Sequence, residues 1–157
     1  MTYQEAVAAL DALYAALPAF TCQGHCQESC GVIMMSRIEW LRITRHLGYK
    51  PKGKPSLVCP MLKHGRCSVH PIRPLVCRLY GLMDEARMHC PWGCQPSRWL
   101  TEEEGYALLE RAEAITQAVF PQSAAVRAWS CALRPPGAAS HLKHLLREAR
   151  MPQGVDE

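Results

Sequence analysis

The spacing of the cysteines limits the possible folds of this chain more than any other feature of its sequence. The 157 residues include nine cysteines, and all but one of them lie between positions 22 and 94. Three intervals have the form C-x3-C, and spacings this short let two thiolates reach one metal with little loss of loop entropy. The sequence therefore predicts a metal centre. Its candidate ligands are Cys22, Cys26, Cys30, Cys59, Cys67, Cys77, Cys90 and Cys94.

The compartment expected from the sequence is the cytoplasm. The N-terminal stretch has no basic start, and Glu5 and Asp11 interrupt its apolar residues. It therefore reads as neither a signal peptide nor a membrane span, and no other stretch reaches the roughly 18 apolar residues that a span needs. Thiols stay reduced in the cytoplasm, and an odd number of cysteines also argues against a paired disulfide framework. The ninth cysteine, Cys131, lies on an alanine-rich amphipathic stretch and is predicted to be a buried core thiol.

The charge of the chain limits the classes of binding partner that we expect. The formal net charge is +4, and the charges are scattered along the sequence. A balance this mild gives no evident nucleic-acid site, and the chain shows no membrane segment. The partners expected are a metal ion or cluster and a possible protein partner.

Apolar residues recur at helical spacing in several stretches of the chain. Two of these stretches begin at capping-box pairs, Ser36 with Glu39 and Thr101 with Glu104. No stretch shows the convincing alternation of a β-strand. Helices are predicted over residues 3–17, 36–47, 71–80, 101–119, 121–133 and 138–149.

These elements predict a small all-α domain with irregular cysteine-rich metal-binding loops. One domain is expected over residues 1–151, with a disordered tail over 152–157. Its cysteine motif spans about residues 20–95, and its C-terminal helices span about 101–149. Within the motif we expect a short knuckle with Gly65 at its tip. The chain holds only two Phe, so its core is thin and a metal would act as a staple.

The first three cysteines cannot share one ion if they lie on a helix. Their Cα atoms would then span about 12 Å, because each helical residue rises 1.5 Å. Either the segment is a loop that folds around the metal, or Cys22 and Cys30 serve different ions. Gly24 favours the loop.

The residues next to the cysteines are compatible with either an iron–sulfur cluster or zinc. Cys59-Pro60 and Cys90-Pro91 are Cys-Pro pairs like the one that closes the bacterial ferredoxin motif, which favours iron–sulfur. The arginines near Cys67 and Cys77 either promote thiolate formation or are ordinary surface residues. The histidines near cysteines either complete a mixed site or are only neighbours. The residues in question are Arg66, Arg73 and Arg78, and His25, His64, His70 and His89.

The central part of the chain resembles the YkgJ-like cysteine-cluster family, a family of zinc- or iron-chelating domains. The resemblance covers about residues 20–95. Upstream, the family shows C-x2-C-x2-CC where this chain has three-residue gaps and no CC doublet, so Cys90 and Cys94 would supply what the doublet gives. The matching segments are Cys59-Pro60-Met61-Leu62, Gly65-Arg66-Cys67-Ser68-Val69-His70 and Arg73-Pro74-Leu75-Val76-Cys77-Arg78-Leu79-Tyr80.

The function predicted from the sequence is an iron–sulfur protein, with a cluster of the 4Fe-4S type in a redox, sensing or modification role. One alternative is a structural zinc module that presents helices to a protein partner. Another is a cluster-dependent methyl-transfer-type enzyme, because the same type of cysteine cluster is found in the flagellin lysine methylase. A radical S-adenosylmethionine enzyme is disfavoured, since the chain is short for a barrel and its last cysteine gap is one residue too long. No catalytic residue is assigned.

Overall fold

A computed structural model describes residues 1–25, 27–31, 33, 35–52 and 58–121. The predictions for Cys26 and Cys131, the helices expected over 121–133 and 138–149 and the tail over 152–157 lie outside these residues, apart from residue 121 itself. Among the described residues, no helix is long and apolar enough to cross a membrane.

The described part of the chain is small and rich in helix, with one short hairpin. The sequence predicted an all-α domain, and the hairpin shows that this prediction was too narrow. The helices are α1 (Tyr3–Ala15), α2 (Arg37–Leu47), α3 (Leu75–Leu79) and α4 (Glu102–Val119), with 3-10 helices η1 (His70–Ile72) and η2 (Ala86–Met88). The antiparallel strands are β1 (Leu62–Lys63) and β2 (Arg66–Cys67).

Capping boxes fix the starts of the three long helices. The pairs predicted for α2 and α4 are both formed, with the hydroxyls of Ser36 and Thr101 accepting from the backbone N–H three residues later. Helix α1 begins with a third capping box, between Thr2 and Glu5, which the same sequence pattern would have revealed. Gly48 ends α2 in the left-handed conformation, with φ of 72°.

The single helix predicted over residues 71–80 is wrong. Helix η1 stops at Ile72, and Arg73 is extended, with φ of −55° and ψ of 147°. Pro74 disfavours the helical conformation for the residue before it, so the chain leaves one helix before it can enter the next. Pro74 then caps α3, whose first helical residue is Leu75.

A hairpin turn lies where a knuckle was expected. His64 and Gly65 have φ of 51° and 73°, as a two-residue turn with both central residues at positive φ requires. The turn pairs Leu62 with Cys67. The strands are two residues long, too short to show an alternating pattern in the sequence.

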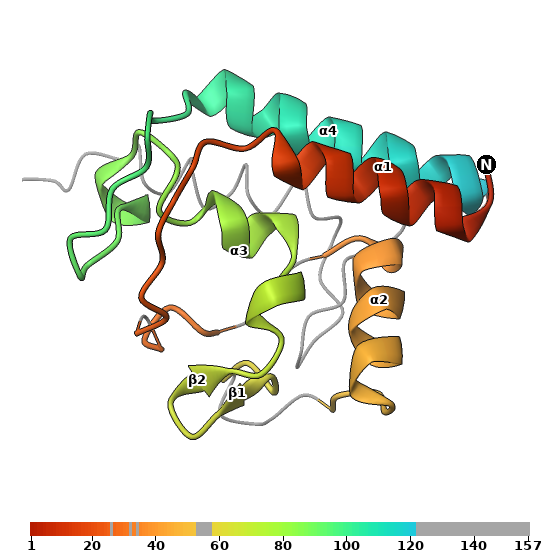
Figure 1. Ribbon diagram of the computed structural model, residues 1–157, viewed down its shortest axis with the longest axis horizontal. Helices are drawn as coiled ribbons and strands as arrows, with labels where there is room; N and C mark the ends of the chain where they lie inside the picture. The colour runs from red at the N-terminus through yellow and green to blue at the C-terminus, as the bar shows by residue number, and fades with distance from the viewer. Residues whose placement is uncertain (26, 32, 34, 53–57, 122–157) are drawn as a thin grey trace, which may run out of the picture.

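Two separate cores hold the molecule together. The larger lies where α1 and α4 run side by side with α3 against α4, and α2 contributes Ile38 to it (Figure 1). The smaller core lies between α2 and the hairpin and includes Cys59, with Cys30 and Cys67 packed against it. Several of the predicted metal ligands are therefore part of a core, which fits their role as packing residues as well as thiols.

Candidate metal centre

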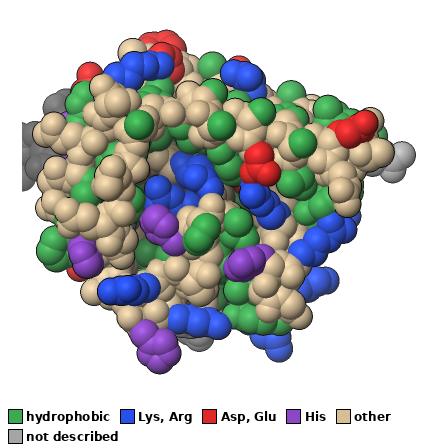
Figure 2. Space-filling model, viewed as in Figure 1, with side chains coloured by type: hydrophobic (Ala, Val, Ile, Leu, Met, Phe, Trp, Pro, Cys, Tyr) green, Lys and Arg blue, Asp and Glu red, His purple; other side chains and the backbone are tan. Residues whose placement is uncertain are grey.

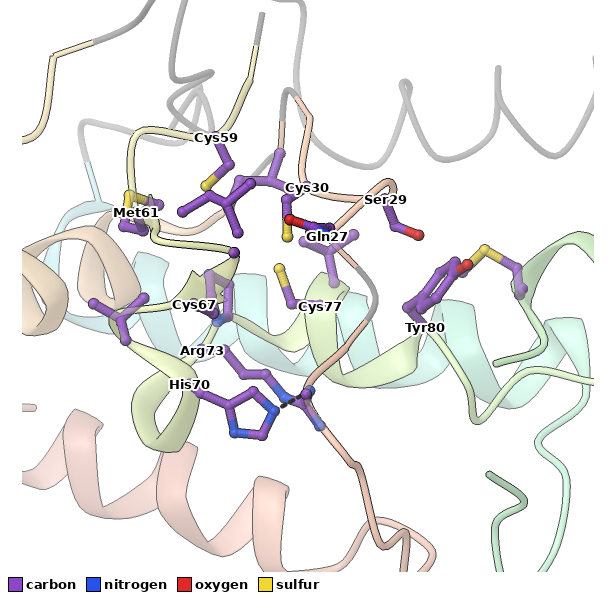
Figure 3. A pocket seen from close by; sticks show the side chains of 18 residues that line it. Gln27, Ser29, Cys30, Cys59, Met61, Cys67, His70, Arg73, Cys77 and Tyr80 are labelled. Carbon is purple, nitrogen blue, oxygen red and sulfur yellow. Dashed lines mark hydrogen bonds between the residues drawn. The ribbon is translucent and has the colours of Figure 1, made fainter. Parts of the chain in front are cut away.

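Four of the predicted ligands surround one cavity of about 230 Å³. They are Cys30, Cys59, Cys67 and Cys77. Figure 3 shows the side chains of Cys30, Cys59 and Cys77 directed toward the same space, although they come from a loop, the approach to the hairpin and helix α3. The rest of the wall is mostly apolar. Its apolar members include Ile33, Met61, Leu62, Val69, Val76 and Met88.

Backbone contacts bring these cysteines together from distant parts of the chain. The backbone N–H of Cys59 donates to the carbonyl of Cys30 at 2.9 Å, which joins the first loop to the approach of the hairpin. Strand pairing then places Cys67 beside Leu62, two residues after a turn. Helix α3 supplies Cys77 from the opposite side of the cavity.

Burial dominates the electrostatics of the cavity thiols. It raises the pKa of Cys77 far above its usual range, and the nearby thiols of Cys59 and Cys67 raise it further. The pKa of Cys67 is also raised, chiefly by burial, although the backbone N–H of Val69 and the charge of Arg73 oppose the change. Without a metal, these two thiols therefore keep their protons at neutral pH.

Arg73 is the cation of the cavity. One of its terminal nitrogens lies 3.0 Å from His70 Nε2 and 3.7 Å from Cys22 Sγ. Burial, followed by the charges of Arg73 and Arg78, lowers the pKa of His70, so its neutral imidazole can accept from Arg73. Arg73 Nε is buried and has no hydrogen-bond partner among the described residues. Figure 2 shows a hollow near the centre of this face, with Lys or Arg and His side chains in and beside it.

The other two arginines considered from the sequence have different roles. Arg78 donates to the carbonyls of Arg73 and Pro71, and its guanidinium lies 4.2 Å from the centre of the Tyr14 ring. It thus ties α3 to its surroundings. Arg66 is exposed on the hairpin.

A second group of cysteines lies outside the cavity wall. Phe20 and Pro96 form an antiparallel bridge, and Ser97 donates to the carbonyl of Ala19 at 2.8 Å. Continuing this register by two residues places Cys22 opposite Cys94. Sequence spacing could not show this pairing, because it joins segments more than 70 residues apart.

Contacts within the second group involve three thiols. The Gln23 backbone N–H lowers the pKa of Cys94, but partial burial and the nearby thiols of Cys90 and Cys22 raise it overall. Cys22 Sγ accepts from the Gly24 backbone N–H at 3.3 Å. Each cysteine that the structure describes is a thiol and not half of a disulfide.

The histidines near cysteines differ in position. His70 lines the cavity beside Arg73. His25 faces Trp92, with ring centres 5.5 Å apart, and His89 packs on Trp99 at 4.1 Å. His64 lies in the hairpin turn.

The predicted ligand set is thus divided between two places. The sequence analysis favoured a loop over residues 22–30. The described residues of this segment form no helix, and Gly24 has φ of 73°. Its described cysteines belong to different groups, Cys30 to the cavity and Cys22 to the surface group with Cys90 and Cys94. In the part of the chain that the structure describes, no three or more His, Cys, Asp or Glu side chains are arranged to hold a single metal ion.

Comparisons with family models, curated proteins and solved structures find no match for this chain. The resemblance to the YkgJ-like cysteine-cluster family stays a prediction.

Proposed function

We propose that this chain is an iron–sulfur protein whose cluster is held by Cys30, Cys59, Cys67 and Cys77. The observation that carries the proposal is the placement of these four residues around one cavity. Four cysteine thiolates are the usual ligand set of a 4Fe-4S cluster.

The shape of the site supports a cluster over a single zinc ion. Tetrahedral zinc with Zn–S bonds of about 2.3 Å holds its four sulfurs about 3.8 Å apart around a point. Here the cysteines surround a cavity of about 230 Å³. A cluster contains its own iron and sulfide core, so its ligands stand farther apart and enclose a volume.

The chemistry of the wall supports the same choice. An apolar shell and hydrogen bonds to sulfur are the means by which proteins set the potential of an iron–sulfur cluster. The cavity has mostly apolar walls, and Arg73 brings a positive charge and a buried Nε–H that has no partner among the described residues. This N–H could donate to a cluster sulfur, and the charge would offset that of the thiolates.

The number of ligands bears on the role of the cluster. When four cysteines bind the four irons, no iron is left open for a substrate. The proposal therefore favours a redox or sensing role over a reaction at the metal. A structural zinc centre is the alternative, and metal analysis separates the two.

The test is metal analysis of protein purified and reconstituted without oxygen, with iron, zinc and acid-labile sulfide measured together. We expect iron and sulfide in about equal amounts and a brown protein. Cys59→Ser and Cys77→Ser should lose most of both, whereas the matched variant Cys90→Ser should keep them. Cys26→Ser in the same assay tests the sequence prediction for that residue. Colourless protein with stoichiometric zinc and no iron would contradict the proposal.

A further inference from the structure

The surface group of cysteines is built differently from the cavity. Cys90 and Cys94 lie on one tight turn, in which the Gly93 backbone N–H donates to the carbonyl of Cys90 at 3.1 Å. Gly93 has φ of 74°, a conformation that other residues rarely adopt. This turn folds the C-x3-C segment back on itself, and Cys90 lies close enough to Cys94 to raise its pKa.

Contacts with an earlier segment of the chain hold this turn in place. The bridge between Phe20 and Pro96 anchors the chain just after Cys94, and the Gln23 backbone N–H donates to Cys94 Sγ. His25 and Trp92 make a ring contact across the same two segments. These contacts hold the turn that carries the two thiols against the segment from Phe20 to His25.

The group is also open to solvent. The residues between the two cysteines, at positions 91–93, are all exposed, and the Trp92 side chain is 52% exposed. Neither Cys90 nor Cys94 lines the cavity. A small molecule can thus reach this pair without entering the proposed cluster site.

We propose that Cys90 and Cys94 form a reversible disulfide by exchange with a small-molecule disulfide such as oxidised glutathione. A thiolate of the pair attacks one sulfur of the reagent, forming a mixed disulfide and releasing one thiolate of the reagent. The second thiolate of the pair then attacks the protein sulfur of that mixed disulfide and releases the other half of the reagent. Two electrons pass from the cysteine pair to the reagent, and the two thiol protons pass to the two released thiolates.

The proposal is independent of the cluster. Because the pair lies outside the cavity, the proposed iron centre and the disulfide can each be present or absent without the other. Cys22 is the third thiol of the group, and its segment is joined to that of Cys94 by the bridge between Phe20 and Pro96. It provides a matched control, because it shares the surroundings of the pair but lies on a different segment.

The test uses full-length protein equilibrated without oxygen in glutathione buffers of increasing oxidised fraction, then blocked with a maleimide and digested with trypsin. Cleavage after Arg87 and Arg98 releases residues 88–98, which hold both cysteines of the pair and no other. We expect this peptide to lose two hydrogen atoms in mass and to escape the maleimide as the oxidised fraction rises. The peptide with Cys67 and Cys77, residues 67–78, should show no such loss.

Variants separate this inference from the proposed cluster. Cys22→Ser should still form the disulfide, and the double variant Cys90→Ser with Cys94→Ser should keep its iron and sulfide. A cross-link between residues 88–98 and the N-terminal peptide, or full maleimide labelling of both cysteines in every buffer, would overturn the inference. Loss of iron from the double variant would overturn it as well, since the pair would then be ligands. Failure of the wild-type protein to bind iron, with the disulfide still forming, would count only against the cluster.

Discussion

The Glu39 carboxylate accepts a hydrogen bond from the Leu75 backbone N–H at 2.6 Å, and so one buried side chain joins two helices. Its second oxygen accepts from the Ser36 backbone N–H at 2.7 Å and closes the capping box of α2. Its first oxygen also accepts from the Tyr14 hydroxyl on α1. Helix α3 has only five residues, too few to be stable alone, and it carries Cys77. Glu39 therefore helps to place a candidate ligand that it does not touch.

Replacing this carboxylate tests that role. Glu39→Gln keeps the shape but turns an N–H donor toward a backbone N–H, so we expect a loss of about 1–3 kcal/mol in the free energy of unfolding. Urea unfolding followed by circular dichroism measures it. The matched control is Glu5→Gln, which alters the exposed capping box of α1 and should cost about 0.5 kcal/mol or less. Equal losses in the two variants would contradict the role given to Glu39.

The stability of the metal-free protein should fall in alkali. Burial raises the pKa of Cys77, and a raised pKa stabilises the folded state most below the unfolded value of about 8.5. As pH rises above that value, the unfolded chain releases the proton that the folded chain retains. The free energy of unfolding should therefore decrease by up to about 1.4 kcal/mol per pH unit for this group. Urea unfolding at pH 8, 9 and 10 measures the slope.

A variant without the titrating thiol isolates the cause. Cys77→Ser should be less stable at every pH but should show a shallower slope than the wild type, because serine does not titrate in this range. An unchanged slope would assign the pH dependence to other groups.

Removal of the metal should destabilise the smaller core and leave the larger core unchanged. The smaller core, with Met35, Ile43 and Met61, is packed against the cavity cysteines, whereas the core between α1 and α4 has no cysteine among its members. Amide hydrogen exchange should therefore become faster in the hairpin and its approach after iron is removed by a chelator, and should change little in α1 and α4. Faster exchange throughout α1 and α4 would show that the two cores unfold together.

Arg73 should raise the reduction potential of the proposed cluster. Arg73→Met removes a positive charge from the cavity wall, so reduction, which adds negative charge, should become less favourable. The reduction potential should fall by tens of millivolts, which corresponds to a change on the order of 1 kcal/mol at an effective dielectric constant near 20. A spectroscopic redox titration measures the potential. Arg66→Met on the exposed hairpin is the control and should leave it unchanged.

Local signals in the sequence predicted the long helices well. The apolar spacing of α1 and the capping boxes of α2 and α4 act within a few residues, so they can be read without knowledge of the fold. The same kind of reading failed at Pro74, because two prolines near the start of a helix are compatible with the pattern but not with the backbone of Arg73. The turn at Gly65 was expected, but the two strands beside it escaped notice because two-residue strands carry no periodicity.

The candidate site was predictable in its residues but not in its arrangement. Short spacing left open whether Cys22 and Cys30 share a site, and tertiary pairing separates them. The bridge at Phe20 and Pro96 draws one to the surface turn, and the hydrogen bond from Cys59 to Cys30 draws the other to the cavity. Both contacts are long-range, and neither leaves a mark in the local sequence. Arg73 was one of several candidate arginines, and only the fold shows that it lies in the cavity wall.

The stretch from Phe20 to Cys30 is fastened at both ends. One residue inserted between Phe20 and Cys22 would move Cys22 by one position relative to Cys94, because the bridge sets the register of the two segments. An insertion near Ser29, in the exposed loop, would leave both attachments in register. The two attachments thus decide which cysteines meet, because one brings Cys22 beside the turn of Cys90 and Cys94 and the other brings Cys30 to the cavity.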